Sequence, residues 1–379
     1  MGPKVSIIVP VCNAEAYLEE CLASIAQQTL RDIEVVCIDD GSTDKSPELL
    51  AAFARRDPRF RIITKENAGY GAAMNDGLAA ATGEYIGCVE SDDFIEPEMF
   101  ERLYEVAHAN DADVVKCDFF ETSGAGATQA NRHFEICPGK DFYGRVLDST
   151  KSEALFYCVM MTWEGIYRKG FIEEHGIRHN ESPGASFQDN GFWFQVFLRA
   201  RRVVFLNEAY YHYRVDNSGS STHSSAAAAR IFGEFAYVRE LLERDPRDWA
   251  RMATVYSYFY FDNLVARLGH IAPEDRAEVA ARVGREWLAC QGRGEVDRSL
   301  FPPLLIEVLD EVASDPGAYR PEGHASIEVD SWDEVAARHG RTEMLRESIS
   351  PYSVVSQYVR CIVEDAVMDD GARGQRHAG

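Results

Sequence analysis

The sequence lacks cysteines at the spacing of a metal site. None of its nine cysteines forms a Cys-x-x-Cys pair, and several lie inside apolar runs, where cysteine behaves as a small hydrophobic residue. The odd, scattered set also gives no disulfide framework, which indicates a reducing compartment. A zinc site and a disulfide-rich secreted fold are both disfavoured. The cysteines are Cys12, Cys21, Cys37, Cys88, Cys117, Cys137, Cys158, Cys290 and Cys361.

Long apolar runs are also missing. No segment approaches the roughly 18 apolar residues that cross a bilayer. The apolar stretch at residues 5–11 is too short for a signal peptide and lacks a basic flank and a cleavage site. We therefore expect a cytoplasmic protein, with a place of action at the inner face of the membrane left open.

Positive charge is scarce. Lys and Arg number 39 against 62 Asp and Glu, which gives a formal charge of −23. This balance disfavours nucleic acid and an anionic membrane surface as direct partners, because both need compensating cations. It suits a protein that takes up its substrate together with a metal ion.

Apolar segments and helical patterns alternate in the first third of the chain, which has ample hydrophobic residues for a packed core. This alternation predicts an α/β fold with an open, mainly parallel sheet flanked by helices. Ligands of such sheets bind outside the carboxyl ends of the strands. Strands are predicted at residues 4–11, 34–38, 61–64, 84–89 and 113–118, and helices at 14–28, 46–56, 71–81 and 97–110.

Farther along, the pattern becomes helical. We predict helices at residues 151–161 and 187–199 and extended segments at 203–206 and 209–215. A Ser-rich segment at 216–225 is the expected boundary between a first domain, 1–222, and a helical C-terminal region, 223–379, whose tail from about 369 is expected to fray. The helices of this region are predicted at residues 226–242, 249–268, 273–290 and 329–347.

The aromatic stretch at residues 256–261 is apolar on too many sides for a free surface helix. We expect it to pack on the first domain. A dimer contact and a membrane-proximal contact are the alternatives.

Acidic residues follow two of the predicted strands. The segment at residues 84–93 ends in Glu90, Asp92 and Asp93, and the segment at 34–44 ends in Asp39 and Asp40 before a Gly-Ser turn. Carboxylates crowded at one sheet edge repel each other, and a hard divalent cation would relieve that repulsion. Each segment alone could be a solvated turn, but the repetition favours a binding site.

These segments resemble the family 2 glycosyltransferases, inverting enzymes with the Rossmann-like GT-A fold. The resemblance covers roughly residues 4–222 and rests on six motifs in the family's order. They are Val5-Ser-Ile-Ile-Val-Pro-Val-Cys-Asn13, Asp39-Asp-Gly-Ser-Thr-Asp44, Asn67-Ala-Gly-Tyr-Gly-Ala-Ala-Met-Asn-Asp-Gly77, Thr82-Gly-Glu-Tyr85, Glu90-Ser-Asp-Asp93 and Gln188-Asp189.

The resemblance implies a nucleotide-sugar donor, and Asp40 or Asp39 would accept the N3–H of uracil. The alternative is that both acids only cap the following turn. Glycines after Asn67 would allow close approach of the donor, and Lys65 would supply charge where Met74 replaces a usual Arg. The other donor-binding residues that the resemblance implies are Pro10, Val11, Asn13, Gly69, Asn75, Glu90 and Ser91.

The resemblance also implies a cofactor, Mn²⁺ or Mg²⁺, bound by Asp92 and bridging the donor diphosphate. His212 is a second candidate ligand, and with Arg214 it could reach the phosphates, although a structural role for this Tyr-rich strand is equally open. Ser220 and Ser221 would belong to a lid over the donor.

Asp189 is the implied general base, which takes the proton of an acceptor hydroxyl as that oxygen attacks the anomeric carbon. The alternative is a helix cap. Gln188 stands where the family usually has an acid, and Trp163 and Glu164 are candidates for the acceptor cleft, with buried packing the alternative for Trp163.

We therefore expect a metal-dependent glycosyltransferase acting on a glycan or lipid-linked acceptor, with peripheral membrane association and homodimerisation left open. A nucleotidyltransferase is disfavoured, because the loop that begins at Cys12 is neither basic nor Gly-rich. A degenerate transferase domain that serves as a scaffold is the non-enzymatic alternative, supported by Gln188 and Met74.

Overall fold

The first four strands of the chain pair in parallel, in the spatial order β3-β2-β1-β4. The computed structural model describes residues 2–137, 140–158, 160–185, 187–217, 227–268, 271 and 273–317. Every residue of β1 is buried, and all except Ser6 are apolar; the Ser6 hydroxyl donates to the Glu34 carboxylate of β2. These elements are β1 (Val5–Val11), α1 (Leu18–Ala26), β2 (Ile33–Asp40), α2 (Ser46–Arg56), β3 (Phe60–Lys65), α3 (Tyr70–Ala80) and β4 (Tyr85–Cys88).

The rest of the sheet is mixed. β8 lies between β4 and β6 and is antiparallel to both, whereas β6 and β9 pair in parallel. The extended segments predicted at 203–206 and 209–215 form one strand, β9, and the helix predicted at 151–161 is a short 3₁₀ turn, η3 (Glu153–Tyr157). The remaining elements are β5 (Phe94–Ile95), α4 (Met99–Asn110), β6 (Val114–Ser123), β7 (Ala130–Phe134), β8 (Gly165–Arg168), α5 (Lys169–Glu174) and β9 (Val203–Arg214).

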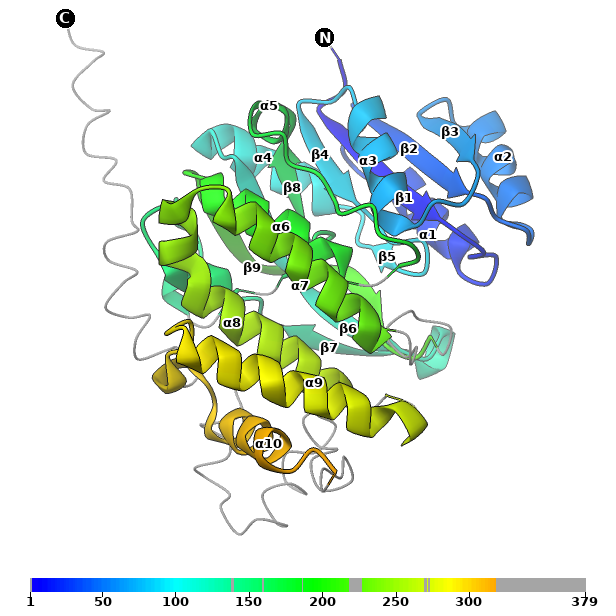
Figure 1. Cartoon of the computed structure of the whole chain (residues 1–379). Helices are drawn as coiled ribbons and strands as arrows, with labels where there is room; N and C mark the ends of the chain where they lie inside the picture. Colours follow the sequence, from blue (N-terminus) through cyan, green and yellow to red (C-terminus); the bar gives the residue numbers. More distant parts are fainter. Residues whose placement is uncertain are drawn as a thin grey trace, which may run out of the picture.

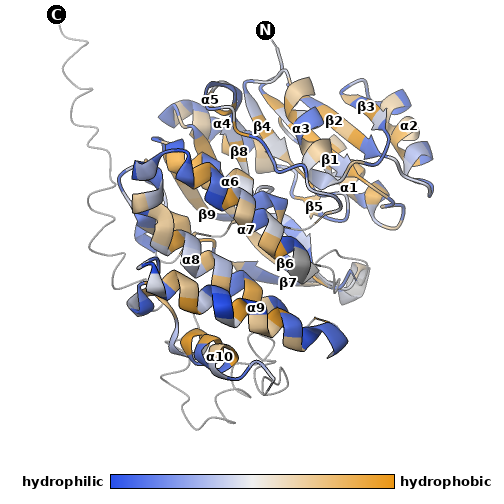
Figure 2. Cartoon of the chain, viewed as in Figure 1, coloured by the Kyte–Doolittle hydropathy of each residue, from blue (hydrophilic) through white to orange (hydrophobic). Residues whose placement is uncertain are grey.

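Helices cover the second half of the sheet and continue into the C-terminal region (Figure 1). α7 packs against α6 and α8, and α9 packs against α8 and α10. Hydrophobic colour concentrates on the strands, and α9 alternates between hydrophilic and hydrophobic residues (Figure 2). The helices are α6 (Gln188–Arg199), α7 (Ala227–Glu243), α8 (Pro246–Leu268), α9 (Pro273–Gly292) and α10 (Pro303–Ser314).

The aromatic stretch at 256–261 lies in α8 and is buried. Phe259 contacts Trp193 of α6, with ring centroids 5.7 Å apart, and Tyr258 contacts Tyr157 of η3 at 5.2 Å. The expectation that the stretch packs on the first part of the chain is confirmed. One hydrophobic cluster runs from β1 to α10.

The α/β architecture and the helical C-terminal region agree with the sequence predictions. The helix predicted at 329–347, the tail from 369 and most of the expected boundary at 216–225 lie outside the described residues. Among the residues that are described, no helix is both long and apolar enough to cross a membrane.

Candidate active site

A cleft of about 740 Å³ opens at the carboxyl ends of β1, β2 and β4. One wall, the β1–β2 side, is formed by Pro10, Val11, Cys12, Asn13, Asp40, Asn67, Gly69 and Tyr70. The other side, called the α6 side, includes Met160, Met161, Thr162, Trp163, Gly184, Ala185, Phe187, Gln188, Asp189, Asn190, Asn263 and Arg267. The acidic turn Glu90, Ser91, Asp92 and Asp93 lies between the walls, and Asn217 and Tyr213 also line the cleft.

The structure brings most of the predicted site residues to this cleft. All six motifs except the Thr82 motif contribute a lining residue. Six predicted residues that the structure describes do not line it: Asp39, Lys65, Asn75, Glu164, His212 and Arg214. Ser220 and Ser221 lie outside the described residues.

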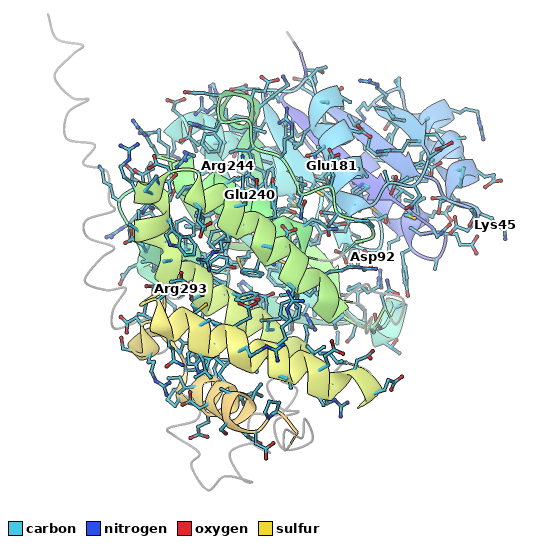
Figure 3. All side chains as sticks on the ribbon, in the orientation of Figure 1. Lys45, Asp92, Glu181, Glu240, Arg244 and Arg293 are labelled. Carbon is cyan, nitrogen blue, oxygen red and sulfur yellow. The ribbon has the colours of Figure 1, made fainter. Side chains whose placement is uncertain are left out.

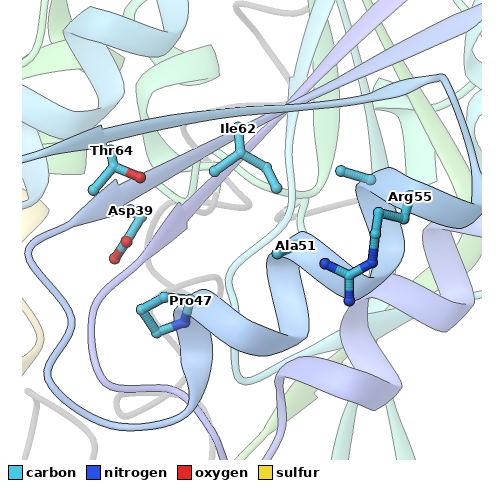
Figure 4. Close-up of a pocket in the computed structure, with 7 residues that line it drawn as sticks. Asp39, Pro47, Ala51, Arg55, Ile62 and Thr64 are labelled. Atoms are coloured by element: carbon cyan, nitrogen blue, oxygen red, sulfur yellow. The ribbon is translucent and has the colours of Figure 1, made fainter.

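Asp39 and Asp40 point to opposite faces of β2, because successive residues of a strand alternate. Asp40 lines the cleft, and its two carboxylate oxygens accept hydrogen bonds from the backbone N–H groups of Ala68 and Gly69, both at 2.9 Å. Asp39 accepts from the Ser42 N–H at 3.0 Å and lines a separate surface hollow with Pro47 and α2 (Figure 4). Of the two acids, only Asp40 is placed for a ligand in the main cleft.

Two asparagines fix the loops around Asp40. The Asn13 side-chain oxygen accepts from the Thr43 N–H at 2.7 Å, and Asn67 donates to the Asp40 carbonyl at 2.9 Å. Asn13 itself adopts a left-handed backbone, with φ of 54°, which asparagine tolerates better than most residues. The β1–β2 side is therefore held by its own hydrogen bonds.

The glycines at the start of α3 allow residues 180–184 to pack closely against this helix, so their small size serves a contact within the protein. A Cβ atom on Gly71 would lie 1.9 Å from the Asn180 carbonyl oxygen, and one on Gly69 would lie 2.9 Å from Gly184. Asn75 extends this contact, since its amide donates to the His179 carbonyl at 3.0 Å and accepts from the His179 N–H at 2.9 Å. Asn75 therefore fastens residues 179–184 to α3 instead of reaching the cleft.

Lys65 and Met74 also differ from their expected places. Lys65 forms an ion pair with Asp76 at 2.6 Å, so its charge is used on the surface of α3. Met74 is buried, with its sulfur 3.8 Å from that of Cys88, so this position faces the core and not a donor phosphate.

Two acids of the acidic turn have raised pKa values. Burial raises the pKa of Glu90 to about 8, against the opposing effect of a 2.7 Å hydrogen bond from the Tyr70 hydroxyl. Burial also raises the pKa of Asp93 well above its usual range, although Tyr211 donates to it at 2.8 Å and the Arg214 N–H donates at 2.8 Å. Asp92 accepts a hydrogen bond from Asn217 at 2.8 Å.

His212 and Arg214 lie behind this turn. Because Tyr213 faces the cleft, strand alternation turns its neighbours to the opposite face of β9. Both ring nitrogens of His212 are engaged, one with Thr122 at 3.0 Å and one with Glu96 at 2.9 Å, so the structure does not present it as a metal ligand. Arg214 donates to the Asp92 carbonyl at 3.0 Å and pairs with Glu20 at 2.7 Å, which braces the turn from outside the cleft.

Asp189 lies in the first turn of α6 and lines the same cleft as the acidic turn. Burial raises its pKa to about 6, and the backbone N–H of Asn190, which donates at 3.1 Å, opposes the rise. Phe187, immediately before the helix, has a left-handed backbone with φ of 67°, which is strained for a bulky residue. Such strain concentrates at functional sites.

Gln188 has a structural reason to be an amide. Its nitrogen donates to the Ser182 hydroxyl at 3.0 Å and to the Gly184 carbonyl at 3.2 Å. An ionised carboxylate has no hydrogen to donate, so the usual acid could not make these bonds. The substitution thus stabilises the segment that α3 holds.

The residues of the acidic turn fit a divalent cation. Glu90 and Asp92 both reach the cleft, and carboxylate oxygens are ligands that Mg²⁺ and Mn²⁺ prefer. Among the described residues, no three His, Cys, Asp or Glu side chains form a complete site. This donor set matches a cation that takes one or two ligands from the protein and the others from substrate phosphates and water.

Several lining residues were not predicted. Tyr213, Asn217, Met160 and Phe187 have no motif, and Asn263 and Arg267 come from α8, beyond the part of the chain that carries the resemblance. Arg267 is the one Lys or Arg among the described residues that line the cleft. Helical periodicity reveals the buried face of α8 but not what lies opposite it. Trp163 both lines the cleft and stacks on Tyr211 at 4.1 Å, so its two predicted roles coexist.

Comparisons with known proteins agree on the family. Residues 6–171 match the model of "Glycosyl transferase family 2". The chain is 36% identical over 228 residues to the uncharacterized glycosyltransferase EpsJ of Bacillus subtilis (strain 168), covering 59% of this chain. It is 31% identical over 253 residues to the glycosyltransferase GlyG of Streptococcus pneumoniae serotype 4, covering 64% of this chain and 78% of GlyG. The match spans 64% of the length of EpsJ, which is less than two thirds.

The fold is similar to that of residues 1–349 of S. aureus TarS, solved in complex with UDP-GlcNAc. The TM-score is 0.56 at 18% identity, and the similarity covers 94% of this chain and 92% of the TarS fragment. This likeness shows that the mixed sheet with its flanking helices is the GT-A fold.

Proposed function

Because the chain belongs to glycosyl transferase family 2, we propose that it is an inverting, metal-dependent glycosyltransferase. It moves a hexosyl or N-acetylhexosaminyl group from a nucleotide donor to a hydroxyl of a glycan or lipid-linked acceptor. The proposal is carried by the convergence of Asp40, Asp92 and Asp189 on one cleft from three separate segments. A nucleoside contact, a metal carboxylate and a base are what this reaction needs.

The β1–β2 side binds the nucleoside. Asp40 already accepts two backbone hydrogen bonds, but each carboxylate oxygen has a second lone pair, which can accept the N3–H of uracil. Pro10 and Val11 supply apolar contact for the base, and Asn67 lies beside them. Since TarS, which has a similar fold, binds UDP-GlcNAc, this UDP-sugar is the first donor to test.

Asp92, with Glu90 beside it, would hold the divalent cation, and the charge of that cation would stabilise the nucleoside diphosphate as a leaving group. The main-chain carbonyl of Asp92 is fixed by Arg214, and its carboxylate is oriented by Asn217. The protein therefore presents this acid in a defined position. A carboxylate that is already oriented loses little conformational entropy when a ligand binds.

The α6 side binds the acceptor and carries the base. An acceptor hydroxyl oxygen attacks the anomeric carbon from the face opposite the diphosphate, and the carbon–oxygen bond to the diphosphate breaks with its electron pair. Asp189 takes the hydroxyl proton, and a single displacement inverts the configuration. A base with a pKa of about 6 is largely ionised at neutral pH and still close enough to it to accept a proton efficiently. Trp163 and Phe187 supply aromatic contact surface on the acceptor side.

The setting that we propose is the assembly of cell-surface polysaccharide at the cytoplasmic face of the membrane, where a lipid-linked acceptor would bring the enzyme to the bilayer. Dimerisation and peripheral membrane association belong to the same proposal.

Donor hydrolysis tests the proposed function. The protein is mixed with UDP-, GDP- and dTDP-sugars and Mn²⁺, and the released nucleoside diphosphate is counted. Release from one donor, lost in Asp92→Ala and kept in Asp245→Ala, is the expected result. Asp245 is a suitable control because it pairs with Arg247 at 2.7 Å and does not line the cleft. Failure of every donor to bind would overturn the proposal and favour a scaffold, whereas binding without release would call for an acceptor screen.

A further inference from the structure

A fully buried ion pair lies behind the α6 side of the cleft. Lys116 of β6 and Glu164, the residue before β8, have no exposed side-chain surface, and their charged atoms are 2.5 Å apart. The Lys116 ammonium also donates to the Met161 carbonyl at 2.7 Å and lies 5.7 Å from the Phe197 ring of α6. Burying two charges costs several kcal/mol per ion, and an apolar pair of similar size is often as stable. Stability alone is therefore a weak explanation for this pair.

The pair is attached to the cleft wall at both ends. Met161 and Trp163 line the cleft, and Glu164 directly follows them. The Cys117 N–H donates to the Glu164 carbonyl at 2.8 Å, and Lys116 stands opposite Gly165 in the β6–β8 register. The wall is thus fixed to β6 by main-chain bonds and by the Lys116 side chain.

The charges of this pair and of Asp189 influence each other's pKa. The Lys116 ammonium lowers the pKa of Asp189 against the larger effect of burial, and the Asp189 charge adds to the burial that raises the pKa of Glu164 to about 7. Among the described residues, Asp189 also raises the pKa of several acids and phenols, and Arg267 of α8 lines the same cleft. These acids and phenols are Tyr70 of α3, Glu90 of the acidic turn, Tyr167 of β8, Tyr213 of β9 and Glu234 of α7.

We propose that Lys116 and Glu164 are positioning residues for glycosyl transfer: they hold the wall at Met161–Glu164 in place, and the charges of both act on Asp189. The inference rests on the proposed function, in which Asp189 is the base. Neither residue touches the substrate, so their effect passes through Asp189 and through the wall that contacts the acceptor.

The first test needs no activity. The Asp189 carboxyl carbon is titrated by ¹³C NMR in protein with labelled aspartate, and its signal is identified by its loss in Asp189→Asn. Lys116→Met leaves at most a negative charge behind Asp189, and Glu164→Gln leaves at most a positive one. Asp189 should therefore titrate at higher pH in Lys116→Met than in Glu164→Gln, by roughly one pH unit. Equal titration in the two variants would overturn the electrostatic part of the proposal.

The second test uses the double variant Lys116→Met/Glu164→Gln, which leaves no buried charge unpaired and should fold. We expect its kcat to fall at least about tenfold while the donor KM stays within about twofold, since the donor binds at the other wall. A folded double variant with wild-type kcat would overturn the positioning role. The control is Arg239→Met/Glu295→Gln. This variant removes an ion pair whose charged atoms are 2.9 Å apart and whose residues do not line the cleft, and it should change neither kcat nor the donor KM.

If the wild-type protein transfers no sugar, the proposed function fails, and kcat and KM cannot be compared in the double variant. The NMR titration still decides whether the pair controls the ionisation of Asp189, so the two failures can be told apart.

Discussion

The two walls of the cleft use their acids in different ways. On the β1–β2 side, the two carboxylate oxygens of Asp40 accept hydrogen bonds from the backbone N–H groups of Ala68 and Gly69. On the α6 side, burial raises the pKa of Asp189 to about 6 and that of Glu234 behind it to about 7. A carboxylate that backbone hydrogen bonds hold in place serves as an oriented acceptor, whereas a carboxyl group whose pKa approaches neutrality can exchange a proton. The first wall is suited to recognition and the second to proton transfer.

Asp189→Asn tests the difference between the two sides most directly, because it keeps the shape of the side chain and removes the base. We expect kcat to fall about 10²- to 10⁴-fold, the usual contribution of general base catalysis. The dissociation constant of UDP with Mn²⁺ should stay within about threefold, because the donor contacts lie on the other wall. Calorimetry and product counting give both quantities. An active Asp189→Asn would assign the base to another residue.

The same contrast sets the pH dependence of the wild-type enzyme. A protonated Asp189 cannot accept the hydroxyl proton, so kcat/KM should fall as the pH drops below about 6, the pKa that burial gives this residue. The binding of UDP should keep its affinity across the same range, because Asp189 lies on the side of the cleft that does not hold the nucleoside. A loss of binding in parallel with activity would show that both walls respond to the same titration.

Asp40→Asn tests the recognition wall, and its neighbour provides the control. Asp39 and Asp40 are about equally buried, at 2% and 3% exposed, but only Asp40 lines the cleft. Losing the charge-assisted acceptor should weaken UDP binding roughly 30- to 100-fold, or about 2–3 kcal/mol. Asp39→Asn should leave the affinity near that of the wild type. Equal losses in both variants would mean that the effect is one of folding.

Asp39 and Asp40 also show what could and could not be predicted from the sequence. The parallel strands, α2 and the acidic strand ends follow from apolar periodicity and spacing, and strand alternation alone could have separated Asp39 from Asp40 and His212 from Tyr213. The place of β8 could not be predicted, because four residues that pair with both β4 and β6 give no local signal.

The other residues that were not predicted depend on contacts between segments far apart in the sequence. Lys116 and Glu164 meet only because β8 enters the sheet beside β6. Arg267 reaches the cleft only because α8 packs against η3 and α7. Periodicity reports the buried face of an element and is silent about which distant segment covers it. The predicted site was therefore most complete on the β1–β2 side, where the residues are close in sequence.

Gly71→Ala tests the joint between the two walls. The new Cβ would collide with the Asn180 carbonyl and push residues 180–184, and with them Asp189, away from α3. We expect a loss of about 2 kcal/mol in the free energy of unfolding, typical of overpacking, and a lower kcat. Gly170→Ala is the matched control, because a Cβ there meets nothing within 4 Å. Wild-type stability in Gly71→Ala would show that the segment yields at little cost.

The smallest expected effect is a change of stability with pH at Glu234, which is 1% exposed and accepts hydrogen bonds from Asn180 and the Gly191 N–H. Burial raises its pKa from 4.5 to about 7. The folded protein therefore binds this proton more tightly than the unfolded chain does, so the stabilising contribution is full below about pH 4.5 and is lost as the pH rises through 7.

Glu234→Gln does not titrate, so its stability relative to the wild type should improve by about 1–2 kcal/mol between pH 5 and pH 8.5 in denaturant unfolding. Glu240→Gln on the same helix, which is exposed and labelled in Figure 3 with its partner Arg244, should show no such trend. If the difference between Glu234→Gln and the wild type is the same at both pH values, Glu234 is ionised throughout. The α6 side would then hold a second buried negative charge beside Asp189, and the division between a recognition wall and a proton-transfer wall would rest on Asp189 alone.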